Sequence, residues 1–140
     1  MDALNIIYKN SPFKEEYDED NSFAGKLYEY CIWDTEEYCK LEWAIYFIHK
    51  HNIRNEDLFR IFFDMQEKVI TTMLSHFIKH DVVKIVNLKN QQIIEYNWRI
   101  SYVIRSYIMN YKIKINSLDG DIVNPYLTDD LLLDLPKTTK

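Results

Sequence analysis

A chain of 140 residues with 47% apolar residues has the length of one domain and enough apolar side chains for a core, so we expect residues 1–140 to form a single domain. Its two glycines, Gly25 and Gly120, are too few for a glycine-rich phosphate-binding loop or a G-x-S-x-G nucleophile motif, which excludes the enzyme classes built on them. The net charge of −5 is uneven: −6 in residues 1–40, +4 in residues 41–115 and −3 in residues 116–140.

The N-terminal part of the chain is predicted to include a short extended segment, and it carries a dense block of acids. Five carboxylates surround one tyrosine within six positions, and the block reads Glu15, Glu16, Tyr17, Asp18, Glu19, Asp20. A solvated loop is the plain interpretation of such a block. Its charge would also repel nucleic acid and attract a basic partner.

Two helices are predicted to follow the acidic block. Ser22 can cap a helix from Phe23 to about Trp33, because a serine hydroxyl accepts hydrogen bonds from the free N–H groups of a first turn. Asp34 then begins the pattern D-T-E-E, which resembles a capping box. The apolar stripe of the second helix is wide, which indicates a central position in the fold; it contains Tyr38, Leu41, Trp43, Ala44, Ile45, Phe47 and Ile48.

The strongest helical periodicity runs from Glu56 to His80, with Asn55 as its cap. Asn90 is predicted to cap the last long helix. Between them, residues 82–88 are rich in β-branched side chains and could form a short strand or continue the helix.

The C-terminal part of the chain has weaker secondary-structure patterns. Residues 112–116 alternate with period two and could form an isolated strand, and Leu131–Leu133 are predicted to dock as a short helical turn. Proline is absent from Phe13 to Asn124, which leaves long helices unbroken. We therefore predict a mainly α fold: an irregular bundle of about four main helices with short extended segments near the termini.

The search for catalytic or metal-binding residues finds one weak candidate. His76 and His80 lie four apart, a spacing that places both on one face of a helix and can hold a metal, but no third ligand accompanies them. The helical acids do not form the E-x-x-H repeats of a di-iron bundle; these acids are Glu42, Asp64, Glu67 and Glu95. We expect no catalytic residue, no cofactor and no metal, with a small metal-binding protein or enzyme using His76 and His80 as the alternative.

A protein partner fits the charge pattern better than nucleic acid does. The four excess bases of the middle segment are spread over 75 residues, so pairing with the acids of the first forty residues is the simpler expectation. Tyrosines lie inside the same acidic segment, where aromatic contact area and charge suit a basic protein; these are Tyr8, Tyr17, Tyr28, Tyr30 and Tyr38.

The sequence also predicts the cellular compartment of the protein. No apolar run is long enough for a membrane span, and no signal peptide is visible at the N-terminus, so we expect a cytoplasmic protein. Cys31 and Cys39 match no zinc-binding spacing and are predicted to be reduced thiols.

The first third of the chain resembles a known family. The segments that carry the resemblance are Leu4–Tyr8, Phe23, Leu27, Glu36–Tyr38 and Leu41–Tyr46. They are similar to small bacterial immunity proteins of contact-dependent and polymorphic toxin systems, in particular to Immunity protein 41. The resemblance implies a non-enzymatic antitoxin that binds a cognate toxin domain and blocks it.

Joined to the charge pattern, the resemblance gives a specific hypothesis about the site. The partner would be a basic toxin, such as a nuclease, and the acidic block would contact it; the predicted partner-binding residues are Glu15, Glu16, Tyr17, Asp18, Glu19 and Asp20. The helices, or the acidic tail with Asp129, Asp130 and Asp134, are alternative contact surfaces. A phage-type inhibitor or adaptor with another target would have the same composition.

Overall fold

The computed structural model describes residues 1–113, 122–128 and Leu131, and these residues contain five helices and no strand. The helices are α1 (Ala3–Lys9), α2 (Phe23–Tyr30), α3 (Thr35–Lys50), α4 (Glu56–Phe77) and α5 (Asn90–Met109). The predicted mainly α bundle is confirmed, with its four main helices present as α2 to α5.

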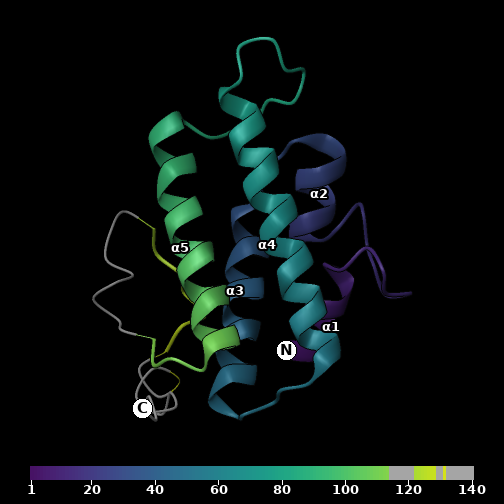
Figure 1. Cartoon of the computed structure of the whole chain (residues 1–140), viewed down its shortest axis with the longest axis vertical. Helices are drawn as coiled ribbons and strands as arrows, with labels where there is room; N and C mark the ends of the chain where they lie inside the picture. The colour runs from purple at the N-terminus through teal and green to yellow at the C-terminus, as the bar shows by residue number, and fades with distance from the viewer. Residues whose placement is uncertain (114–121, 129–130, 132–140) are drawn as a thin grey trace.

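The helices pack around α3 (Figure 1). α1 packs on α3, and α5 packs on both α3 and α4. α4 and α5 lie side by side and run in opposite directions, while α1 and α2 lie on one side of the bundle, joined by the loop that carries the acidic block. Among the described helices, none combines the length and apolarity that a bilayer crossing requires.

Three of the four predicted helix caps are confirmed. Ser22 Oγ accepts from Gly25 N at 2.9 Å, Asp34 Oδ1 from Glu37 N at 3.0 Å, and Asn55 Oδ1 from Leu58 N at 2.9 Å. The prediction for Asn90 is wrong by one position. Asn90 is the first helical residue of α5, and Lys89 is the N-cap residue. The backbone N–H of Lys89 donates to Gln92 Oε1 at 2.9 Å.

Two helices end earlier than their apolar patterns predict. α2 stops at Tyr30 because Cys31 adopts the left-handed conformation with φ of 54°, after which Trp33 turns into the core. α4 stops at Phe77, where the Lys84 Nζ donates to His76 O at 2.8 Å and to Ile78 O at 2.6 Å. A lysine from the next loop therefore satisfies carbonyls that a longer helix would have used.

The predicted extended segments are partly corrected. Residues 3–9 form α1, capped by Asp2 and held by the burial of Ile6 and Ile7. Residues 82–88 form no strand, although Val86 N bonds Cys31 O at 3.1 Å and Ile85 is buried.

The remaining C-terminal predictions are only partly covered by the described residues. Residues 112 and 113 form no strand, and residues 114–116 lie outside the described residues. Of the predicted turn at 131–133, Leu131 is helical and buried, and the other two residues lie outside the described residues.

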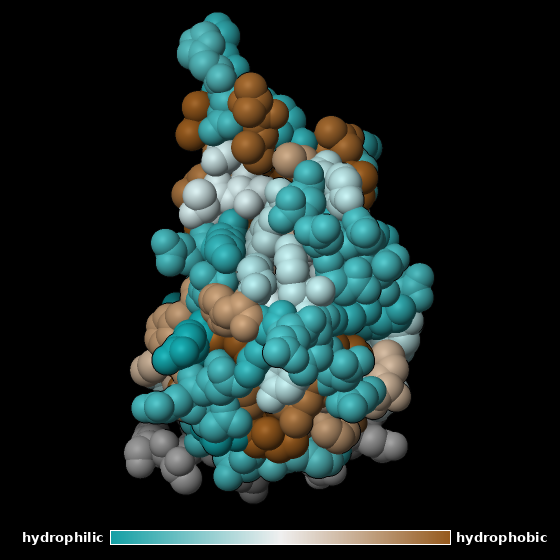
Figure 2. Space-filling model, turned by 90° about the vertical axis from the view of Figure 1, so that its right-hand side faces the viewer, coloured by the Kyte–Doolittle hydropathy of each residue, from teal (hydrophilic) through white to brown (hydrophobic). Residues whose placement is uncertain are grey.

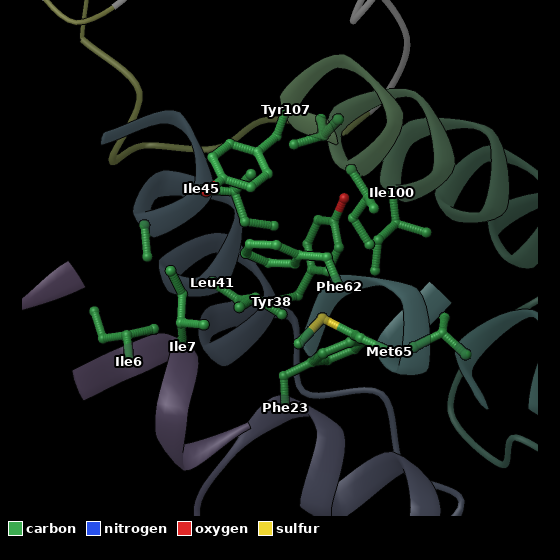
Figure 3. Packing of buried hydrophobic residues seen from close by; sticks show 14 of the residues in the cluster. Ile6, Ile7, Phe23, Tyr38, Leu41, Ile45, Phe62, Met65, Ile100 and Tyr107 are labelled. Atoms are coloured by element: carbon green, nitrogen blue, oxygen red, sulfur yellow. The ribbon is translucent and has the colours of Figure 1, made fainter. Parts of the chain in front are cut away.

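The core joins α2, α3, α4 and α5, whose labelled side chains point toward one another in Figure 3. At one end, Phe23, Trp33, Tyr38 and Tyr96 form an aromatic cluster with ring centroids 4.4 to 5.4 Å apart. Edge-on and tilted ring contacts of this kind add to the burial of apolar area. Part of the aromatic content of the chain, which is 15% of its residues, is therefore buried inside the fold. Cys31 and Cys39 are free thiols, as predicted.

A buried ion pair ties the C-terminal segment to the bundle. Arg99 on α5 binds both oxygens of Glu42 on α3, with Nε to Oε2 at 2.7 Å and Nη2 to Oε1 at 2.6 Å. Tyr38 and Asn124 also donate to this carboxylate, and Arg99 donates to Ile122 O at 3.0 Å. Burial lowers the pKa of Arg99, but the hydrogen bonds and charge of Glu42 outweigh burial, so the net pKa is raised.

Candidate functional site

The loop between α1 and α2 is a folded element that presents the acidic block. Asp18 organises it: its backbone N donates to Lys9 O at 2.9 Å, and its Oδ1 accepts from Asn21 N at 2.9 Å and from Asp20 N at 3.2 Å. Ser22 N in turn donates to Asp18 O at 3.1 Å. Asp18 is therefore occupied in holding the loop, as aspartate commonly is in turns.

Gly25 on α2 lets this loop lie directly on the helix. A Cβ at this position would come within 2.5 Å of Asp18 O and of Glu19 Cα, and within 2.6 Å of Glu19 O. All three are backbone atoms, which cannot rotate away. One of the two glycines of the sequence thus allows the close approach of the acidic loop to α2.

We expect Gly25→Ala to destabilise the protein and to displace the loop. Alanine raises intrinsic helix propensity, but the clash with the loop backbone is expected to dominate and to lower the free energy of unfolding by about 1–3 kcal/mol. Urea denaturation measures the free energy, and cleavage by a glutamate-specific protease reports exposure of Glu15, Glu16 and Glu19. A more stable variant with unchanged cleavage would show that the loop does not depend on this contact.

The structure divides the six predicted partner-binding residues into two groups. Glu15, Glu16, Glu19 and Asp20 are exposed, whereas Tyr17 and Asp18 are half-buried. Tyr30 Oη donates to Asp20 Oδ1 at 2.5 Å, which fixes one of the exposed carboxylates against α2. Four carboxylates therefore point to solvent from a loop whose backbone is held in place.

A groove of about 470 Å³ lies beside the loop, between α2 and α4. Its lining comes from the loop and from both helices: Pro12, Tyr17, Tyr28, Glu29, Glu67, Lys68, Thr71 and Thr72. Burial raises the pKa of Tyr17, and the charges of Glu29 and Glu19 raise it further. The Tyr17 hydroxyl therefore stays protonated and available as a donor.

The groove combines aromatic walls with acidic rims. Glu29 and Glu67 are exposed, and Lys68 pairs with Asp64 at 3.1 Å. The Tyr28 hydroxyl is enclosed and has no hydrogen-bond partner among the described residues. Such a surface suits a basic side chain, which could contact both the aromatic faces and the carboxylates.

Sequence reasoning found the loop but missed the groove. Glu29 is distant in sequence from Glu67 and Thr71, and the packing of α2 on α4 brings them together. Glu67 was considered only as a helical acid, and nothing in the sequence paired it with Tyr17.

The acids of the first forty residues do not pair as the sequence suggested. Among the described residues, the acids of this segment that form ion pairs bind lysines of the same segment: Lys9 lies 2.9 Å from Glu37, Lys26 lies 2.6 Å from Asp34, and Lys40 lies 2.9 Å from Glu37. The basic excess of the middle segment therefore does not neutralise the acidic loop through these contacts. Figure 2 faces the side that carries α1 and α2 and shows mainly hydrophilic residues across its middle, with hydrophobic residues near its upper end and in its lower part.

Not all tyrosines of the acidic segment are placed to contact a protein partner. Tyr38 is buried in the core and donates to Glu42 Oε2 at 2.7 Å. Tyr8 is half-buried, with Lys14 Nζ 4.7 Å from its ring centroid. The tyrosines that border the loop and the groove are Tyr17, Tyr28 and Tyr30.

The histidine pair does not form the arrangement that its spacing suggested. α4 ends at Phe77, so His80 lies beyond the helix. Both nitrogens of His76 have partners: Nδ1 accepts from Ile85 N at 2.9 Å, and Nε2 lies 3.1 Å from Asn90 Oδ1. Within the described ranges, no group of three or more potential ligands gathers around a common point. His76 instead joins the end of α4 to the following loop and to α5.

Comparison with known proteins identifies a family to which the chain is similar. The model of the family described as Immunity protein 41 matches residues 9–122, a range that includes the acidic loop and the four main helices. No curated protein and no solved structure matches the chain.

Proposed function

This chain belongs to the Immunity protein 41 family, and from this premise we propose that it protects its host cell by binding a cognate toxin domain through the acidic loop and the α2–α4 groove. The observation that carries the proposal is the loop itself. Four exposed carboxylates stand on a backbone fixed by Asp18 and by the contact with Gly25. A surface fixed before binding loses little conformational freedom when a partner docks.

The negative charge of the loop indicates which class of toxin it would bind. A nuclease has a basic cleft that receives phosphates, and carboxylates can occupy the same positions. Glu15, Glu16, Glu19 and Asp20 would face this cleft, while Tyr17 and Tyr28 would receive a basic side chain in the groove. Long-range attraction would accelerate the encounter, and aromatic contact would slow release. We therefore propose a toxin with a basic substrate-binding surface, a nuclease of a contact-dependent or related polymorphic toxin system, and inhibition by occlusion in the cytoplasm.

Co-expression tests this function. The toxin domain encoded beside the gene for this chain is induced in a sensitive strain, with or without the chain. We expect toxin alone to stop growth and the chain to restore it, while an immunity protein of an unrelated family serves as the control. Growth arrest that persists at equal expression levels of folded chain would contradict the proposal.

A further inference from the structure

The α2–α4 groove already holds a cation of the chain itself. Lys68 on α4 lines the groove, and its Nζ lies 3.1 Å from Oδ2 of Asp64, one turn earlier on the same helix. The same Nζ lies 5.9 Å from the ring centroid of Phe13 in the loop and 5.9 Å from that of Tyr28 on α2. Both distances are at the outer limit of a cation–π contact. The ammonium group is therefore within reach of aromatic rings from two elements and beside a carboxylate.

Lys68 leaves one polar atom of the groove without a partner. The Tyr28 Oη is enclosed and forms no hydrogen bond with the described residues. Burial raises the pKa of Tyr28, and the charge of Asp64 raises it further, so the hydroxyl stays protonated and its oxygen can still accept a hydrogen bond. An enclosed polar atom without a partner costs free energy, and a ligand that supplies the hydrogen bond removes this cost.

The other polar groups of the groove favour a cation with several donors. The charged lining residues are two acids and one base, Glu29, Glu67 and Lys68, so the lining carries one excess negative charge. Glu29 on α2 and Glu67 on α4 are both exposed, and they come from opposite walls. A guanidinium has five donors in a plane and stacks on aromatic rings, whereas an ammonium is compact and strongly hydrated. Acceptors on two walls beside aromatic rings therefore fit arginine better than lysine.

We propose that the groove binds an arginine side chain of the toxin, and that Lys68 holds its place in the free chain. The guanidinium displaces the Lys68 ammonium from the aromatic rings, donates to the Tyr28 Oη and pairs with Glu29 or Glu67. Lys68 can give way because its side chain is 42% exposed, and exposed side chains change rotamer rapidly. This inference rests on the proposed function and names the toxin side chain that the groove receives.

Tyr28→Phe separates recognition from stability. The change removes only a hydroxyl that lacks a partner in the free chain, so urea denaturation should show a free energy of unfolding equal to or above that of the wild type. The dissociation constant for the cognate toxin domain, measured by surface-binding kinetics, should rise about tenfold or more. Tyr46→Phe is the matched control, because the Tyr46 Oη is also enclosed without a partner but lies outside the groove lining. It should leave toxin affinity unchanged.

Lys68→Met is expected to change affinity in the opposite direction. The toxin arginine then no longer displaces a like charge, and the dissociation constant should fall about fivefold. Lys79→Met, at an exposed lysine in the loop between α4 and α5, changes the net charge by the same amount and should not strengthen binding to this extent.

Replacing each arginine of the toxin domain in turn by lysine identifies the partner side chain. One replacement should weaken binding, and its effect should not add to that of Tyr28→Phe. A wild type that binds the toxin no more tightly than Tyr28→Phe does would overturn the arginine site, as would a Lys68→Met variant that binds no better than Lys79→Met. A wild type that does not bind the toxin at all would overturn the proposed function and, with it, this inference.

Discussion

Glu42→Gln is expected to lower the free energy of unfolding by about 3–5 kcal/mol, because it leaves the guanidinium of Arg99 buried without its countercharge. Glu42 and Arg99 are 1% and 8% exposed, so water cannot replace the lost partner. The same change weakens the acceptor for Tyr38 and for Asn124, and thereby loosens the segment that holds Ile122. Urea denaturation monitored by tryptophan fluorescence measures the loss.

A double-mutant cycle separates the ion pair from other effects of the substitution. Replacing Glu42 and Arg99 together by methionine should cost less than the sum of the two single replacements, because no buried charge is left alone. Asp64→Asn breaks the more exposed pair with Lys68 and is expected to cost no more than about 1 kcal/mol. Additive single and double losses would contradict a coupled buried pair.

Neutralising the exposed acids of the loop is expected to slow toxin association about tenfold to a hundredfold at low salt. The variant carries Glu15→Gln, Glu16→Gln, Glu19→Gln and Asp20→Asn and keeps Asp18, whose carboxylate holds the loop backbone. The salt dependence of the association rate should also flatten, since fewer charges steer the encounter. Stopped-flow or surface-binding kinetics at two salt concentrations measure both effects.

A charge-matched control separates the loop from net charge. Four acids elsewhere are neutralised instead: Glu36, Glu56, Asp81 and Glu95. This variant has the same net charge, so its association rate should fall much less. Equal rates for the two variants would show that the loop is not the steering surface, although the immunity function itself would remain.

Local chemistry explains which parts of the fold could be predicted. Ser22, Asp34 and Asn55 act within four residues of their own position, so their capping role can be recognised in the sequence. The early end of α4 depends on Lys84, which returns from the next loop, and periodicity cannot reveal such a contact. α1 was missed because seven residues form a stable helix only when packed, here on α3.

The candidate site was predictable only in its charge. A block of acids can be recognised from the sequence alone. The structural role of Asp18 and the close contact at Gly25 can be recognised only once the loop is folded. The groove depends on the packing of α2 against α4, and the sequence does not show which apolar side chains of a helix face the core. Trp98 shows the difficulty: it is a large apolar side chain in a long helix, yet it is 75% exposed.

Calorimetric titration of the chain into its purified cognate toxin domain tests the central claim most directly. We predict saturable binding with a dissociation constant on the order of nanomolar, one chain per toxin domain, and loss of toxin activity in step with occupancy. An active toxin domain that releases no heat of binding and keeps full activity with excess folded chain would contradict the account.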